Sequence, residues 1–321
     1  MDYIKKFLTF LKVHKWKWVG ILASTVMFAF WLFPFSDLSD FVSTQVSKLS
    51  NNQIYLQFDN LRISLFPQAG VALSNVHVEG QGLPALKAQE LIITPSIWSL
   101  INQKPAGTIN AQQFLNGQVE VSLKPGTKTE NGTARQKISI SAQKLSLAEL
   151  RGLLDLPLSM KGNLSLESQA QADLTFQEQP DVDFQLKVEK FELPAGNLQT
   201  AMGPISLPEL KLAQVDLKGR LAAGKLIIEQ GVIGQDKDEV HGTLKGDMLL
   251  SINARGGSPA PDFGGYNFEV SLNIKKSFQD RAALFLSCID NYKTPTADGA
   301  LYSFKLTGSN LMAPPSMSAL K

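Results

Sequence analysis

The stretch Gln53–Gly80, QIYLQFDNLRISLFPQAGVALSNVHVEG, decides the fold because its apolar residues recur at every second position. Ile54, Leu56 and Phe58 begin the series, and each is followed or preceded by a more polar residue. Successive side chains of a strand point to opposite faces, so this period predicts β-strands with one buried face. The series continues through Leu61, Ile63, Leu65, Val71, Leu73, Val76 and Val78.

The same alternation returns in short segments as far as Thr307, and most segments are separated by glycine or proline. The clearest are Ala85–Thr94, Thr108–Phe114, Gln118–Lys124, Phe184–Val188, Leu226–Ile228, Met248–Ile252, Phe268–Ile274 and Ala300–Thr307. Roughly a dozen strands joined by short turns predict a mainly β fold built as an antiparallel meander. A single sheet of that size must twist and curl. It can close as a barrel, split into a sandwich, or stay an open trough with an apolar inner face.

Composition divides the chain after Phe35 into two β modules, residues 36–124 and 138–321. The segment 125–137, PGTKTENGTARQK, separates them, and we expect an exposed linker or loop there because it holds almost no apolar residue. A few short helices are expected, and their ranges are 36–50, 96–102, 147–154 and 278–291. Residues 256–265 are expected to form a loop, and the chain is expected to fray after Pro314.

The N-terminal region carries the features of a membrane anchor. Trp18–Phe35 holds no charge and as a helix would be roughly 27 Å long, close to the ~30 Å core of a bilayer. Five lysines precede it, and Asp37 and Asp40 follow it. This asymmetry predicts a cytoplasmic basic stub at 1–17, a transmembrane helix at 18–35, and everything later on the far side of the inner membrane.

Two other interpretations of residues 18–35 fit less well. A cleaved signal peptide would have a shorter apolar core that ends in small residues, whereas this run ends in Trp31–Phe35. A buried core helix would not be expected to follow a cluster of lysines.

Charge and composition exclude several classes of function. The formal net charge is +2, but the first 35 residues hold five lysines and one acid, so the remainder carries 26 basic and 28 acidic residues. A near-neutral domain of this kind is not expected to bind nucleic acid. Cys288 is the one cysteine, so no internal disulfide can form, and its apolar surroundings predict a core position.

No catalytic pattern emerges from the sequence. Gly219–Lys225 resembles a phosphate-binding loop, but Leu226 stands where serine or threonine is needed, and a strand follows where a helix is needed. We therefore expect a strand turn and no nucleotide. Asp236, Asp238 and Glu239 lack the glycine and the terminal glutamate of a calcium loop. The three histidines are far apart in the sequence, which does not suit metal ligands. Because no catalytic pattern is present, we expect no enzyme activity, no metal and no cofactor.

Several segments resemble the AsmA-like family. Leu65-Phe66-Pro67 and Gly70 to Val76 are similar to the turn and the Gly-x-x-Leu-x-Asn-Val motif of its first strand pair. The family's strand, helix and strand unit resembles the segment that begins at Ala85, ALKAQELIITPSIWSLINQKPAGTINAQQF. A later element of the family resembles Leu156–Leu166, LPLSMKGNLSL. With the ending DGALYSFKLTGSNLMAPPSMS, the chain looks most like the bacterial type II secretion system protein N family, which is related to AsmA.

The resemblance implies an inner-membrane protein with a periplasmic β-groove and an accessory role in the type II secretion pathway. AsmA-like relatives imply an alternative, which is a groove for phospholipid transport or outer-membrane biogenesis. The expected partners are therefore the inner membrane and either secretion-system subunits or phospholipid acyl chains.

The predicted groove is an interpretation of the alternating pattern. A closed sandwich is the alternative for an ordinary globular protein, and the resemblance favours an open, curled sheet. Its apolar inner face would shelter acyl chains or an apolar partner segment near the membrane. The inward residues expected from the shared parity are Leu56, Phe58, Ile63, Leu65, Leu73 and Val78.

Overall fold

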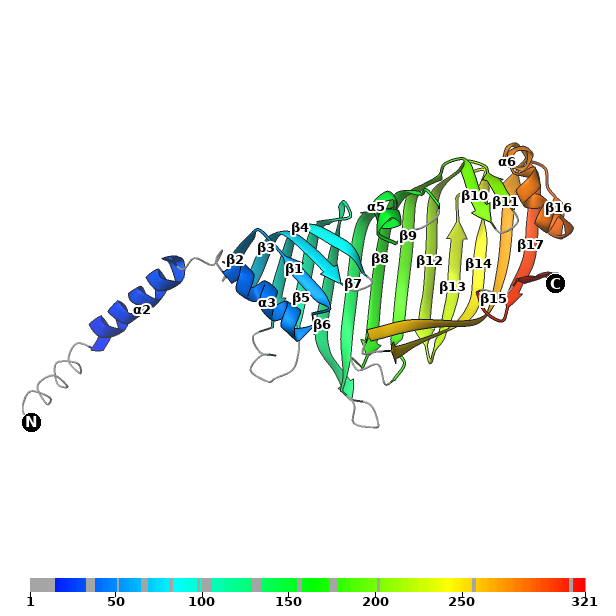
Figure 1. Cartoon of the computed structure of the whole chain (residues 1–321). Coiled ribbons are helices and arrows are strands. Elements are labelled where there is room, and N and C mark those ends of the chain that lie inside the picture. Colours follow the sequence, from blue (N-terminus) through cyan, green and yellow to red (C-terminus); the bar gives the residue numbers. More distant parts are fainter. Residues whose placement is uncertain are drawn as a thin grey trace, which may run out of the picture.

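The computed structural model describes residues 15–32, 38–50, 52–64, 69–80, 83–96, 99, 106–128, 134–154, 158–173, 178–200, 203–255, 258–311 and 314–320. The chain is mainly β, and one antiparallel sheet of 16 strands dominates it (Figure 1). Each strand is followed along the sheet by the next in sequence almost throughout, because short turns join neighbouring strands. The predicted meander is therefore confirmed.

The strands follow the chain from one end of the sheet to the other. Those of the N-terminal half are β1 (Ile54–Gln57), β2 (Asn60–Ser64), β3 (Gly70–Gly80), β4 (Leu83–Pro95), β5 (Gly107–Phe114), β6 (Gly117–Lys128), β7 (Ala134–Ser146) and β8 (Lys161–Ala172). Those of the C-terminal half are β9 (Asp181–Leu193), β12 (Leu210–Ala222), β13 (Lys225–Ile233), β14 (Val240–Arg255), β15 (Ser258–Lys275), β16 (Lys293–Pro295), β17 (Gly299–Gly308) and β18 (Ser316–Ala319). A separate hairpin, β10 (Gly196–Thr200) and β11 (Gly203–Leu207), stands between β9 and β12.

The sheet is open. Its strand path begins at β1 and ends at β16, while β2 pairs with β3 and β18 pairs with β17. Among the described strands no pairing joins the two ends, so the sheet does not close into a barrel. Figure 1 shows a long, curved sheet with helices near its two ends and near its upper edge.

One face of the sheet is apolar along its whole length. Cross-strand partners form an unbroken row from β3 to β17, because each residue of the row pairs with the next. The row consists of Leu73, Leu91, Ala111, Val119, Ala142, Leu166, Leu186, Leu217, Gly231, Leu244, Val270 and Phe304. Since partners directly opposite each other point to the same side, this row defines the apolar face.

Three residues with positive φ keep the apolar face continuous within single strands. In β3 the buried side chains change from odd to even positions between Leu73 and Val76, and Asn75 between them has a φ of 51°. Lys144 in β7 and Lys190 in β9 have φ values of 55° and 54° where the same change of parity occurs. A left-handed residue turns the chain so that the next apolar side chain returns to the same face.

Two hydrophobic clusters lie at the ends of this face. Near the N-terminal end, α3 (Ser39–Leu49) packs through Val42 on buried Phe58, Leu61 and Leu73. At the C-terminal end, α6 (Lys276–Arg281) and α7 (Ala283–Leu286) contribute buried Phe278, Ala282 and Leu286. These pack on sheet residues Leu212, Val240, Ile274, Ala300, Tyr302 and Phe304. The short helices therefore cover the ends of the apolar face.

The expected helices are confirmed in part. α5 (Leu147–Leu154) matches its prediction, and the Ser146 hydroxyl accepts a hydrogen bond from the Glu149 N–H at 3.5 Å. The helix expected at 278–291 is broken into α6, α7 and the 3₁₀-helix η2 (Ser287–Tyr292). Cys288 lies in η2 and is exposed, so the core position predicted for it is wrong. Nearly all of the helix expected at 96–102 lies outside the described residues.

Three segments expected to be irregular are strands. Residues 125–128 and 134–137 extend β6 and β7, which pair with each other, so the sheet crosses the expected linker without a break; residues 129–133 lie outside the described part. Most of the loop expected at 256–265 belongs to β15, and β18 stands in the expected frayed tail. Backbone pairing satisfies the N–H and C=O groups of polar segments too, so low apolar content did not prevent strand formation.

The N-terminal helix α2 (Lys15–Leu32) covers most of the expected transmembrane segment, and residues 33–35 lie outside the described ranges. No helix in the described ranges is both long enough and apolar enough to cross a bilayer. The membrane-spanning helix expected at 18–35 is therefore not found among the described helices. The side chains of Val19, Leu22 and Phe28 are exposed on α2.

Candidate functional site

The candidate site is the part of the apolar face that lies between the two covered ends. We call it the central face, and it belongs to β5, β6, β7, β8, β9, β12 and β13. Its side chains form two adjacent cross-strand rows. The first row is Ala111, Val119, Ala142, Leu166, Leu186 and Leu217, and the second is Ile109, Val121, Ile140, Ser168, Phe184, Gly219 and Ile228.

The larger side chains of the central face are only partly covered, while its small residues Ala142 and Ser168 are buried. Ile109 is 43% exposed, while Val121, Ile140 and Ile228 are half-buried. Among the described elements, β5, β6, β9 and β13 make extensive contacts with their sheet neighbours alone, and α5 packs near the face on β4, β7 and β8. An apolar surface of this kind is stabilised by burial at about 25 cal/mol per Å². The arrangement suits an apolar ligand that lies across the strands.

An aromatic ring covers a glycine within the central face. Phe184 is the cross-strand partner of Gly219, and a Cβ added at Gly219 would lie 2.9 Å from the Cζ atom of the Phe184 ring. The absence of a side chain at Gly219 thus lets the ring lie against the neighbouring strand. The ring is half-buried, so part of it belongs to the exposed surface of the central face.

The opposite face of the same strands is polar and hydrogen-bonded. Ser141 donates to Glu167 at 2.6 Å, and Arg220 pairs with Glu229 at 3.5 Å. A hollow of about 530 Å³ is lined mainly by carboxylates, hydroxyls, amides and one lysine, and Ile140, Phe184 and Gly219 also contribute to its lining. Exposed ion pairs of this kind contribute little to stability. Polar and apolar side chains are therefore segregated to the two sides of one sheet.

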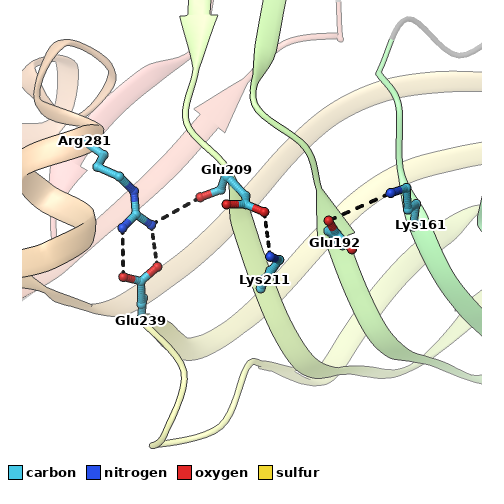
Figure 2. A network of polar contacts seen from close by, with 6 residues as sticks. All are labelled: Lys161, Glu192, Glu209, Lys211, Glu239 and Arg281. Carbon is cyan, nitrogen blue, oxygen red and sulfur yellow. Dashed lines mark hydrogen bonds and ion pairs between the residues drawn. The ribbon is translucent and has the colours of Figure 1, made fainter.

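Ion pairs fix the helical cover at the C-terminal end (Figure 2). Arg281 of α6 contacts Glu239 through both terminal nitrogens, and its Nη2 also donates to the Glu209 carbonyl at 3.5 Å. Hydrogen bonds from Arg281 and then from Ser277 hold the pKa of Glu239 below its ordinary value. Lys211 likewise lowers the pKa of Glu209 through a hydrogen bond. These contacts position α6 beside the start of β12 and β14.

Five of the six groove residues predicted from sequence come together in the structure. Phe58 and Leu73 are buried in the cluster beneath α3, and three half-buried residues pack against it, namely Leu56, Ile63 and Val78. Leu65 lies outside the described residues. The helix α3 thus covers this group, while the central face begins further along the sheet. That the predicted residues line a groove for a ligand stays a prediction.

The residues of the central face were not singled out from sequence, although the alternating pattern that would find them is present. Ile109, Val121 and Ile140 follow the same period as the predicted groove residues. Periodicity shows that these side chains share a face. It does not show which part of that face the helices leave uncovered.

Other sites considered from sequence have simple structural roles. The strand turn expected within Gly219–Lys225 is confirmed at Ala223 and Gly224, while Gly219–Ala222 belong to β12. Lys225 begins β13 and pairs with Asp247 at 3.1 Å. Asp238 accepts hydrogen bonds from the N–H groups of Ala213 and Gln235 in a turn. In the described ranges no three His, Cys, Asp or Glu side chains gather as metal ligands would.

The chain matches no protein family, no curated protein and no solved structure.

Proposed function

We propose that this chain is a non-enzymatic protein that binds an apolar chain across the central face. The single observation that carries the proposal is the continuity of the apolar rows across the middle of the sheet, between α5 and the lower ends of the strands, where the described structure packs no covering layer. Seven strands at about 4.8 Å per spacing give a width of roughly 29 Å. That width suits a long apolar segment better than a compact small molecule.

The backbone hydrogen bonds between the central strands restrict which class of ligand can bind the central face. Each of these strands pairs on both sides with its neighbours, so the face has few free backbone groups to offer. An extended peptide would leave its own N–H and C=O groups unpaired on an apolar surface. An apolar helix satisfies these groups internally, and an acyl chain has none. Both are suitable occupants.

The setting proposed for this activity is the inner membrane, with the N-terminus in the cytoplasm and the sheet in the periplasm. The lysines before residue 18 and the uncharged run 18–35 support it. The resemblance to type II secretion system protein N favours an accessory role in that pathway, with an apolar helix of a secretion subunit as the occupant. The AsmA-like resemblance favours the alternative occupant, a phospholipid acyl chain.

Photo-crosslinking in cells tests the proposal. A photoreactive residue replaces Ile140 on the central face, and the matched control replaces Ser141, which is adjacent in β7 and points to the polar face. We expect crosslinks from position 140 and far fewer from position 141. Crosslinks to secretion subunits support the accessory role, and crosslinks to phospholipid support the lipid alternative. Crosslinks confined to this chain from both positions would overturn the proposal.

A further inference from the structure

The outer half of the β14–β15 hairpin forms an arm that is not part of the sheet ladder. We define the arm as residues 250–255 and 258–263, which pair with each other. The pairing of β14 with β13 ends at Leu249, and the pairing of β15 with β17 begins at Tyr266. The arm can therefore change its position without breaking a hydrogen bond between β14 or β15 and another strand.

The arm begins at a crease in both strands. The register shifts between Met248 and Leu250, and Gly264 and Gly265 lie opposite this point. Glycine permits backbone angles that other residues avoid, so two in succession form a suitable hinge. Figure 1 shows the arm turning away from the direction of β14 and β15 and crossing toward the lower ends of β9, β12 and β13.

Hydrogen bonds to the β12–β13 turn and to Gln179 hold the arm in this position. The Leu250 N–H donates to the Gly224 carbonyl at 2.9 Å in the β12–β13 turn. The side chain of Gln179, just before β9, accepts from the Ile252 N–H at 2.8 Å and donates to the Ile252 carbonyl at 3.1 Å. Arg135 in turn donates to the Gln179 carbonyl at 3.0 Å, which fixes the position of Gln179. One amide side chain thus makes both hydrogen bonds to Ile252.

Two apolar side chains next to the arm are buried. Leu221 near the end of β12 is 5% exposed, and Met248 at the crease is 9% exposed. Ile228 lies in the neighbouring row of the same face and is only half-buried. A Cβ added at Gly224 would lie 3.8 Å from the Cβ of Ser251, so the arm lies directly beside the turn that follows Leu221.

We propose that the arm is a strap that closes the lower end of the apolar face, that it turns at Gly264–Gly265, and that Gln179 is its latch. When the strap opens, the lower end of the face around Leu221 becomes accessible. The purpose of this opening, the entry of an apolar chain, rests on the proposed function. The motion itself is a property of this chain alone and can be measured without a ligand.

Thiol labelling of a position beneath the strap tests the proposal. In a Cys288→Ser background, Leu221→Cys is the reporter, and Ile140→Cys on the central face is the reporter remote from the arm. We expect Gln179→Ala to raise the maleimide labelling rate at position 221 about tenfold, as the loss of two ordinary hydrogen bonds allows. The rate at position 140 should not change, and Gln169→Ala, on the polar face of β8, should leave both rates unchanged.

Hydrogen exchange of the same variants gives a second measurement. Backbone amides of residues 250–255 and 258–263 should exchange faster in Gln179→Ala, while those of 240–248 keep their protection. Gln179→Asn, which shortens the side chain by one methylene, serves if the alanine variant folds poorly. Unchanged labelling at 221 together with unchanged exchange in the arm would overturn the strap, as would rapid labelling at 221 in the parent. A failure to crosslink any partner at Ile140 would instead count against the proposed function.

Discussion

Gly219 shows how one residue shapes the apolar face. The Phe184 ring lies where a side chain of residue 219 would stand, and the Ile227 carbonyl is also close to that position. Any larger residue must displace an aromatic ring or a neighbouring strand. The geometry of the central face therefore depends on a position with no side chain of its own.

Gly219→Val is expected to lower the free energy of unfolding by about 1–3 kcal/mol, because overpacking forces side chains and backbone to shift. Thermal unfolding of the purified chain measures this change. Gly196→Val is the matched control, since the nearest atom to a Cβ there is 3.9 Å away. An unchanged unfolding midpoint for Gly219→Val would contradict this expectation, because it would require both the Phe184 ring and the Ile227 carbonyl to move aside without cost.

Glu239 makes the C-terminal cover sensitive to acid. Arg281 and Ser277 hold the pKa of Glu239 below its unfolded value, so its contribution to stability is complete above the unfolded pKa and is lost as the pH falls through the folded pKa. We expect the unfolding midpoint of the parent to fall more steeply than that of Glu239→Gln between about pH 6 and about pH 3. Parallel pH profiles would contradict this assignment. The ion pair between Lys161 and Glu192 serves as a comparison for this pH dependence, because its charged atoms are 4.0 Å apart and so lie further from each other than those of Arg281 and Glu239.

At the scale of elements, the C-terminal helices differ most from their sequence pattern. The run Ala282–Leu286 is apolar without a break, and the sequence predicts one helix over 278–291. The structure divides them into three short pieces, so that Phe278, Ala282 and Leu286 face the sheet. Leu284 and Phe285 remain exposed. The change of direction between the pieces lets a short segment cover the curved end of the sheet.

The exposure of Cys288 in η2 leads to a direct measurement. The thiol should react fully with an aromatic disulfide reagent in the native chain within minutes, as exposed thiols do. A Leu286→Cys variant in a Cys288→Ser background is the buried control, because Leu286 is 5% exposed. A native thiol that reacts only after addition of denaturant would contradict the exposed position.

For the whole molecule, the orientation in the membrane is the prediction that separates the proposed setting from others. A reporter that is active only in the periplasm, fused after Leu49, is expected to be active because the lysines before residue 18 should stay in the cytoplasm. Replacing those lysines with glutamine should reduce its activity. An inactive periplasmic reporter, together with an active cytoplasmic reporter at the same site, would overturn the proposed orientation.

The alternating pattern was enough to predict a mainly β chain and an antiparallel meander. It also predicted the turn at Gly224 and the helix that begins after Ser146, because turns and helix caps depend on residues close in sequence. The pattern was less informative where polar or glycine-rich segments form strands because they pair with a neighbouring strand. Residues 125–128 and 258–265 were expected to be irregular but lie in strands, since the neighbouring strand supplies their hydrogen bonds.

By itself, the sequence determined which side chains share a face, because the two-residue period of a strand is a local property. The tertiary structure decided that the sheet stays open, that α3 covers the predicted groove residues, and that the central face around Ile140 is left without a covering layer in the described structure. It also decided where Lys144 and Lys190 adopt positive φ. These features depend on contacts between residues far apart in the chain, which periodicity does not record.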